Sequence, residues 1–269
     1  MPRALSTDEI LTLIKDVAVD VIMPRFRQLQ THDVHEKAPG ALVTIADHEA
    51  EREITAALED AYPDAVILGE EAHETDPSLM DRYAAATHAF TVDPVDGTRN
   101  FVAGSPDFAV MVAEVRDGQT VRAWIWQPEH RVAWTAEQDG GTRCNGEPVV
   151  LAPTDRRGDE ALPAGATSLR RLRRQHFTAL APLRPTWWCC GVDYPRLMEG
   201  ETDFIVYHRS WPWDHAPGSL MVTEAGGVVR DLTGDPYSPL LLRPGIIVAR
   251  DRATYDSAVS AIRPYFATG

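Results

Sequence analysis

The segment 93–101, Asp-Pro-Val-Asp-Gly-Thr-Arg-Asn-Phe, holds the residues whose types and spacing most strongly indicate chemistry. Asp93 and Asp96 lie three residues apart around a proline, at the end of an apolar run. Gly97 lets the backbone approach a ligand closely, and a helix or turn that begins at Gly97 and Thr98 would leave backbone N–H groups free to hold a phosphate. Carboxylates beside phosphate donors are typical of Mg²⁺-assisted phosphoryl chemistry. The alternative is that Asp-Pro and Asp-Gly only mark a surface turn.

Other carboxylates stand at the ends of predicted elements. Glu70 and Glu71 follow the apolar run 65–68, which predicts a buried strand. Two strand ends that both finish in acids are expected when ligands gather at one edge of a sheet. Asp214 precedes a helix of small and apolar residues, and Asp47 ends a Thr-x-x-Asp pattern that opens another helix. Taken singly, a solvated turn would explain the glutamate pair, and helix capping would explain both aspartates.

The elements that must position these residues are predicted to be helices followed by strands. A capping-box pattern at Ser6 begins a helix with apolar residues at helical spacing, which should run to about Pro24. A second helix is expected from Ala46 or Asp47 to just before Pro63. The expected strands cover residues 65–68, 89–92, 108–115, 121–126 and 132–136, with a loop over 75–81.

A change in composition after Pro153 indicates two parts with a boundary near residues 145–160. We expect residues 1–150 to form an α+β part that carries most of the candidate metal ligands. Residues 151–269 should form an α/β part that carries Asp214 and the walls of the substrate pocket. The fold class expected for the chain is therefore α/β.

The composition is that of a globular protein, with 269 residues, 44% hydrophobic and 25% charged. The net charge of −14 argues against nucleic acids and anionic membranes as partners. The N-terminus does not have the pattern of a signal peptide, and no apolar segment approaches the ~20 residues of a membrane span. Cys144, Cys189 and Cys190 lack zinc-site spacing and are expected to be reduced thiols of a cytoplasmic protein.

Together, the candidate residues resemble the motifs of the inositol monophosphatase family of Mg²⁺-dependent, lithium-sensitive phosphatases. The residues that carry the resemblance are Glu70, Asp93, Asp96, Asp214 and the pair Thr44 and Asp47, with the segments 69–71, 141–146 and 224–227. These markers keep their order over about residues 37–235. The resemblance implies a layered αβαβα sandwich of the sugar-phosphatase type and a homodimer.

The resemblance also implies the metal ligands. In the family, the positions that match Glu70, Asp93 and the carbonyl of Val95 bind the first ion. The positions that match Asp93, Asp96 and Asp214 bind the second, and a weaker third ion lies near Glu70. The expected cofactor is therefore Mg²⁺, with two or three ions in the site.

The mechanism that follows is an in-line attack on a phosphomonoester by a water molecule that the metal ions activate. Thr98, hydrogen-bonded toward Asp47, would orient this water and accept its proton, with Glu70 assisting. The backbone N–H groups of Gly97 and Thr98 would hold the phosphate, and the ion bound by Asp214 would stabilise the departing oxygen.

Several departures from the family pattern concern the substrate. Tyr207 stands where members that hydrolyse inositol phosphate carry an acid that contacts the ring hydroxyls. Trp187 and Trp188, followed by two cysteines, replace small residues and are either a pocket wall or part of the core. The arginine-rich run 170–174 is either a solvated helix face or a site for a phosphate or a partner.

The expected function is hydrolysis of a small phosphorylated metabolite, with inositol 1-phosphate as the first candidate substrate. Histidinol phosphate is the second candidate, followed by fructose 1,6-bisphosphate and nucleotide 3′-phosphates. An alternative from another class is a non-catalytic relative that only binds a metal ion or a phosphorylated ligand. Titration with Mg²⁺ distinguishes them, because an enzyme shows metal-dependent turnover and a binder shows thermal stabilisation alone.

Overall fold

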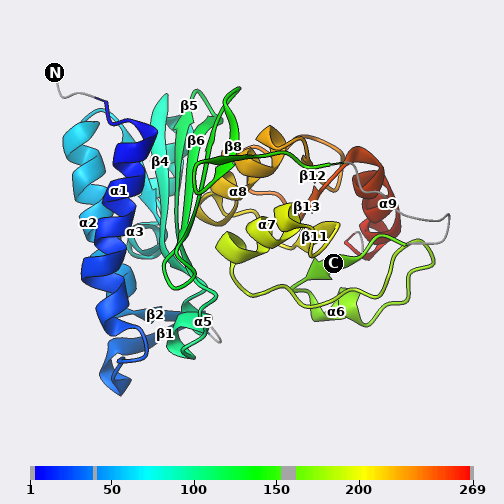
Figure 1. Cartoon of the computed structure of the whole chain (residues 1–269), viewed down its shortest axis with the longest axis horizontal. Coiled ribbons are helices and arrows are strands. Elements are labelled where there is room, and N and C mark those ends of the chain that lie inside the picture. The colour runs from blue at the N-terminus through cyan, green and yellow to red at the C-terminus, as the bar shows by residue number, and fades with distance from the viewer. Residues whose placement is uncertain (1–3, 39–40, 153–161, 267–269) are drawn as a thin grey trace.

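The computed structural model describes residues 4–38, 41–152 and 162–266 and consists of five alternating layers of helices and strands (Figure 1). Helices α1 (Thr7–Val17) and α2 (Ile45–Ala61) cover one face of a large sheet. Helices α7 (Cys190–Glu199) and α8 (Pro212–Glu224) lie between this sheet and a smaller one. Helix α9 (Arg252–Ile262) covers the outer face of the smaller sheet. The predicted layered αβαβα sandwich is confirmed.

Within the described residues, the large sheet has seven strands in the order β3-β4-β5-β6-β7-β8-β9. The pair β3 and β4 is parallel, and every later pair is antiparallel. The strands are β3 (Val66–Gly69), β4 (His88–Asp96), β5 (Ala109–Arg116), β6 (Gln119–Gln127), β7 (Val132–Glu137), β8 (Gly141–Cys144) and β9 (Glu147–Val149). The five predicted strands all lie in this sheet.

The smaller sheet has the order β10-β11-β13-β12, and a separate hairpin pairs β1 with β2. Their bounds are β10 (Gly165–Thr167), β11 (Phe204–Tyr207), β12 (Val228–Asp231), β13 (Ile246–Ala249), β1 (Val34–Ala38) and β2 (Ala41–Thr44). The short helices are α3 (Glu70–Thr75), α4 (Leu79–Ala85), α5 (Thr98–Val102) and α6 (Arg170–Arg173). Strands of the large sheet come from 66–149 and those of the four-stranded sheet from 165–249. Residues 153–161, which overlap the predicted boundary near 145–160, lie outside the described residues, so the two-part division stays a prediction.

The helix ends follow the local sequence closely. Ser6 and Glu9 form the capping box of α1, which continues as a π-helical turn and a 3₁₀ turn that ends at Arg25. Thr44 and Asp47 form the capping box of α2, so this helix begins slightly earlier than predicted. The predicted loop over 75–81 is too long, because Thr75 still belongs to α3 and α4 already begins at Leu79.

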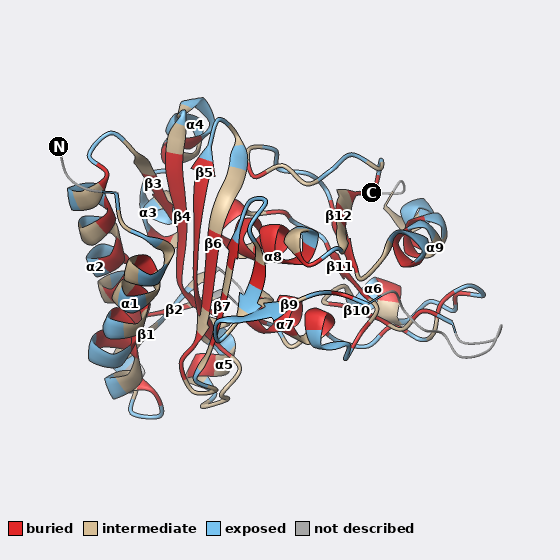
Figure 2. Cartoon of the chain, turned by 45° about the horizontal axis from the view of Figure 1, so that its top comes forward, coloured by how far each residue is buried: buried red, intermediate tan, exposed pale blue. Residues whose placement is uncertain are grey.

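The core lies on both faces of the large sheet, whose central strands are almost entirely buried (Figure 2). Trp124 and Phe90 face α1 and α2, whereas Trp134 belongs to the cluster shared with α7 and α8. Burial of these large apolar side chains on both faces stabilises the sandwich. Within the described part of the chain, no helix is long and apolar enough to cross a membrane.

Helices α7 and α8 approach closely at Gly218, and this contact gives a stability prediction. A Cβ atom at Gly218 would lie 2.2–2.5 Å from ring atoms of the fully buried Tyr194. We expect Gly218→Ala to lower the free energy of unfolding by about 1–3 kcal/mol, because overpacking outweighs the better helix propensity of alanine. Urea unfolding measures this. Glu53→Ala, on the exposed face of α2, is the control and should change stability by less than about 0.5 kcal/mol. An unchanged stability of Gly218→Ala would contradict the prediction.

Candidate active site

Two strand ends bring the first acidic residues together. Strands β3 and β4 run parallel, with Gly69 opposite Val92, so their carboxyl ends share one edge of the sheet. Glu70 begins α3 immediately after β3, and Asp93 follows Val92 in β4. The predicted meeting of acids at this edge is therefore observed.

Strand β4 does not end at Asp93 and Pro94 as predicted but continues to Asp96. Its register with β5 shifts between Asp93 and Asp96, which marks a bulge. Pro94 has no N–H group for the ladder, and prolines in sheets are found at such irregular positions. Because a bulge redirects side chains, it brings two aspartates of one strand toward a common point.

Asp93, Asp96 and Asp214 form a compact carboxylate cluster. One oxygen from each lies within 4.8 Å of the others, and Asp214 reaches the cluster from the first turn of α8. Burial, reinforced by the neighbouring carboxylates, raises the pKa of Asp93 and of Asp214 well above the usual value. Burial also raises the pKa of Asp96 to about 6, against the effect of a hydrogen bond from the Gly191 N–H. Oδ1 of Asp93 is buried and has no hydrogen-bond partner.

Such a donor set fits a hard divalent cation. Mg²⁺ prefers carboxylate and carbonyl oxygens, and carboxylates buried side by side repel one another unless a positive charge or a proton compensates them. Asp93 also has a buried oxygen without a hydrogen-bond partner, which is free to bind a metal ion. The residues present therefore fit the predicted metal site.

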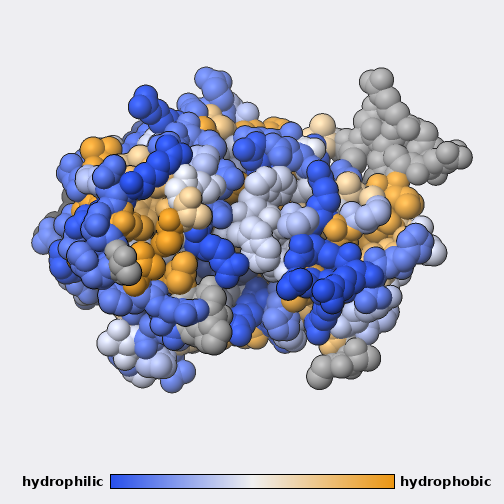
Figure 3. All heavy atoms as spheres, turned by 90° about the horizontal axis from the view of Figure 1, so that it is seen from below, coloured by the Kyte–Doolittle hydropathy of each residue, from blue (hydrophilic) through white to orange (hydrophobic). Residues whose placement is uncertain are grey.

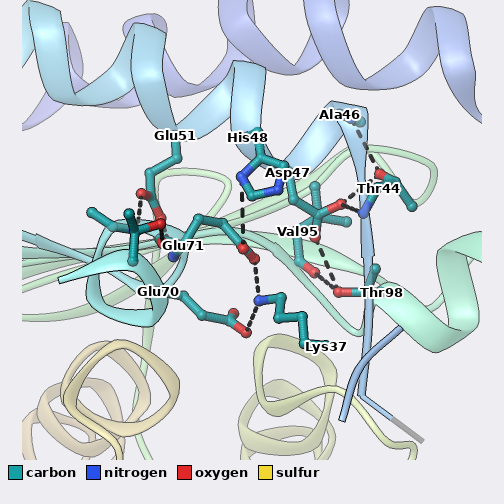
Figure 4. A network of polar contacts seen from close by, with 12 residues as sticks. Lys37, Thr44, Ala46, Asp47, His48, Glu51, Glu70, Glu71, Val95 and Thr98 are labelled. Carbon is teal, nitrogen blue, oxygen red and sulfur yellow. Dashed lines mark hydrogen bonds and ion pairs between the residues drawn. The ribbon is translucent and has the colours of Figure 1, made fainter. Parts of the chain in front are cut away.

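Glu70 is held beside this cluster by Lys37 of β1 (Figure 4). The Lys37 Nζ atom lies 3.1 Å from Oε1 of Glu70 and 2.6 Å from Oε1 of Glu71. Burial raises the pKa of Glu70, and the Lys37 charge opposes this rise. Lys37 therefore fixes Glu70 while leaving its second oxygen outside that ion pair.

Glu51 is a buried residue of the site that the sequence reasoning missed. Its carboxylate accepts hydrogen bonds from the backbone N–H groups of Glu71 (2.8 Å) and Ala72 (2.7 Å), in the first turn of α3. Burial raises its pKa to about 7. The signal was its position one helical turn after Asp47, on the same face of α2. Glu51 anchors the turn that presents Glu70.

Thr98 and Asp47 are in contact, as expected. The Thr98 Oγ1 lies 3.1 Å from Oδ1 of Asp47 and 3.1 Å from the carbonyl oxygen of Val95. Oδ2 of Asp47 accepts hydrogen bonds from the backbone N–H and the hydroxyl of Thr44. Burial raises the pKa of Asp47 to about 6, although the bonds from Thr44 and Thr98 oppose the rise. The buried carboxylate thus fixes the hydroxyl at the edge of the carboxylate cluster.

Gly97 occupies the left-handed region at φ +84° and is the N-cap of α5. A Cβ atom there would lie 2.9 Å from the Cβ of Cys189 and 3.0 Å from the carbonyl oxygen of Asp107. The position therefore requires glycine for both conformation and space. Its N–H donates to the Asp96 carboxylate here, so its predicted role in holding phosphate stays a prediction.

A pocket of about 620 Å³ opens beside Asp96 and Asp214. Tyr207 lines it, at the end of β11, and the tyrosine hydroxyl donates to Oδ2 of Asp193 at 3.2 Å. Asp193 is buried in the same wall and was not predicted from the sequence. Aromatic side chains line further parts of the wall, namely Trp188 and Trp211. Of the two adjacent tryptophans, Trp187 packs against the core and Trp188 faces the pocket.

Comparisons with known proteins agree with this geometry. Residues 6–265 match the sequence model of the inositol monophosphatase family. A Pseudomonas aeruginosa protein named Nus factor SuhB is 30% identical over 258 residues, which cover 92% of each chain. An inositol-1-monophosphatase of Rhizobium meliloti is 31% identical over 218 residues, 78% of this chain and 79% of the relative. The solved structure of a Thermotoga maritima IMPase has a TM-score of 0.77 at 25% identity, with 96% of each chain covered.

Proposed function

Because the chain belongs to the inositol monophosphatase family, we propose that it is a Mg²⁺-dependent phosphomonoesterase that hydrolyses a small phosphorylated polyol or a similar metabolite. The observation that carries this proposal is the cluster of Asp93, Asp96 and Asp214, in which Asp93 has a buried oxygen without a hydrogen-bond partner. A cluster of this kind costs stability unless a cation binds. A metal-dependent activity accounts for that cost.

The proposed ligands of two or three Mg²⁺ ions are the cluster carboxylates, Glu70 and the carbonyl oxygen of Val95. When bound, the ions would activate the attacking water and neutralise charge on the phosphoryl and leaving oxygens. Lys37 and Glu51 hold Glu70 in place from two sides.

The chain's own groups would orient the reacting water. Thr98 donates its hydroxyl proton toward Asp47, so its oxygen remains able to accept a hydrogen bond from that water. Asp47, with its pKa raised to about 6, is suited to take up a proton near neutral pH. Glu70 would assist, and the N–H groups of Gly97 and Thr98 would hold the phosphate, for which the Gly97 N–H has to leave the Asp96 carboxylate.

Inositol 1-phosphate is the first substrate to test, and histidinol phosphate, fructose 1,6-bisphosphate and adenosine 3′,5′-bisphosphate follow. The panel is broad because Tyr207 stands where members that hydrolyse inositol phosphate carry an acid that contacts the ring hydroxyls.

We also propose that the protein is a homodimer that acts on small metabolites in the cytoplasm, without nucleic-acid or membrane partners. The three cysteines form no disulfide, which supports a reducing compartment. Relatives named Nus factor SuhB make the enzymatic test necessary, because that name denotes no phosphatase.

The test measures phosphate release from this panel with and without Mg²⁺. We expect release that requires Mg²⁺ from at least one compound. If Mg²⁺ raises the melting temperature but no compound is hydrolysed, the chain is a binding relative and the proposal fails.

A further inference from the structure

The arginine-rich run at α6 divides into two kinds of side chain. Arg170, Arg171 and Arg174 are exposed. On the face seen from below, strongly hydrophilic side chains gather to the right of the centre, beside an apolar patch (Figure 3). Arg173 is only half-exposed, and its Nε atom is buried without a hydrogen-bond partner. A buried guanidinium N–H without an acceptor costs free energy. Arg173 is therefore not part of the solvated face.

Arg173 lies over Trp188, which lines the pocket. The Cζ atom of Arg173 is 5.9 Å from the centroid of the Trp188 ring, and Cζ of Arg99 is 5.7 Å from it. The Trp188 side chain remains 44% exposed. Cation–π contact holds guanidinium groups over aromatic faces, so Trp188 acts as a platform that gathers positive charge at the pocket wall.

The backbone holds Trp188 in a costly conformation. Its φ is +61°, in the left-handed region that favours glycine. The preceding residue, Trp187, is fixed at both ends: its N–H donates to Oδ1 of Asp193 at 2.7 Å, and its carbonyl accepts from the Asn100 amide at 2.8 Å. Strained residues that the surroundings hold in place are concentrated at functional sites.

Arg209 is a second arginine without a carboxylate partner among the described residues, and it lines the pocket directly, whereas Arg173 reaches the pocket wall through its contact with Trp188. Arg209 is exposed at the pocket wall, next to His208. Across the ranges 4–38, 41–152 and 162–266, neither Arg173 nor Arg209 forms an ion pair with a described carboxylate. Arg173 therefore keeps a buried N–H without an acceptor, and Arg209 keeps a charge that no described carboxylate neutralises, so both groups are able to bind an anion from a ligand.

We propose that Arg173 and Arg209, with Trp188 as the platform, form a subsite for a second anionic group on the leaving alcohol of the substrate. This inference rests on the proposed phosphatase function and specifies its substrate class. Asp96 and Asp214, which line the pocket, would take the scissile phosphate through bound metal ions. Arg209 on the same wall and Arg173 over Trp188 would take a second phosphate or a carboxylate, because a guanidinium group binds either in a bidentate manner.

Matched substrate pairs test the subsite and separate the two anions. Inositol 1,4-bisphosphate is compared with inositol 1-phosphate, and 2-phosphoglycerate with glycerol 2-phosphate. Each member is assayed with the wild type and with Arg173→Gln, Arg209→Gln and the control Arg174→Gln, whose side chain is exposed on the same segment. Titration calorimetry with the same compounds in EDTA, where no turnover is expected, measures binding independently of hydrolysis.

We expect the wild type to prefer at least one compound with two anionic groups over its matched partner by roughly tenfold or more in kcat/KM, mainly through KM. Arg173→Gln and Arg209→Gln should each remove most of this preference, whereas Arg174→Gln should keep it. Equal losses for both members of a pair would mean general electrostatic steering and would overturn the subsite. If the wild type hydrolyses both members of each pair equally well, the subsite proposal is overturned, while the proposed phosphatase function stands. If no compound is hydrolysed, the phosphatase proposal fails, and calorimetry still shows whether the arginines bind the second anion.

Discussion

Replacing Asp93 with asparagine is expected to leave less than about 3% of wild-type turnover, because one carboxylate is proposed to serve two metal ions. The same change should make the metal-free protein more stable. Asp93 is buried, and burial together with Glu70, Asp96 and Asp214 raises its pKa well above the usual value. An amide has no charge to desolvate and no like charge to repel.

The pH dependence follows from the sign of this shift. A carboxyl group whose pKa is higher in the folded state than in the unfolded state binds its proton more tightly when folded, so stability falls as pH rises above the unfolded value. The loss of stability continues until the pH exceeds the pKa of the group in the folded state, where it reaches its full size. The stabilisation by Asp93→Asn in EDTA should therefore be large at about pH 8 and should shrink as the pH falls toward about 4.

Scanning calorimetry in EDTA at these two pH values makes the measurement, and Glu114→Gln is a matched control with the opposite sign. Glu114 is also a buried carboxylate, but its hydrogen bonds from His88 and Arg122 outweigh burial and lower its pKa to about 2. Glu114→Gln should lower the melting temperature at about pH 8 and leave Mg²⁺-dependent turnover largely intact, since Glu114 lies outside the site. A metal-free Asp93→Asn protein that melts below the wild type at this pH would contradict the argument.

The sequence predicted those parts of the site that local patterns determine. Apolar runs followed by acids correctly indicated that Glu70 and Asp93 meet at one edge of the sheet, although β4 continues beyond Asp93 to Asp96. The Thr-x-x-Asp pattern correctly placed Asp47 in the first turn of α2. The bulge in β4 was not predicted, because it depends on pairing with β5 rather than on the segment itself. Glu51 and Asp193 were missed for the same reason, since their partners lie 20 and 6 residues away and become neighbours only in the folded chain.

The two adjacent tryptophans show most clearly what the sequence alone could not predict. It left open whether Trp187 and Trp188 belong to the core or to the pocket wall. In the structure, Trp187 packs against the core and Trp188 lines the pocket. The difference arises from the left-handed backbone at Trp188. The preceding residue, Trp187, holds this backbone in place by donating its N–H to Asp193 and accepting a hydrogen bond from Asn100. No composition or periodicity signal marks a non-glycine residue for that conformation.

Thr98→Ala is the second change with a large expected effect, and it should act on kcat. The Thr98 hydroxyl contacts Oδ1 of Asp47 and the carbonyl oxygen of Val95, each at 3.1 Å, and is not part of the carboxylate cluster. Removing it should therefore leave Mg²⁺ affinity nearly unchanged. We expect kcat to fall by about 10²-fold or more, as is typical when a group that orients or accepts a proton is lost.

The pH profile separates this role from a merely structural one. The hydrogen bond from Thr98 stabilises the charged form of Asp47, whose pKa is raised by burial to about 6. Without that bond the pKa of Asp47 should rise further, so the acidic limb of the kcat profile should move to higher pH in Thr98→Ala. Thr98→Ser keeps the hydroxyl and should restore both the rate and the profile.

A double variant tests whether Thr98 and Asp47 act as a unit. If they do, Thr98→Ala combined with Asp47→Asn should lower kcat little more than the more damaging of the two single changes does. Fully additive losses, or an unchanged kcat in Thr98→Ala, would remove Thr98 from the proposed mechanism.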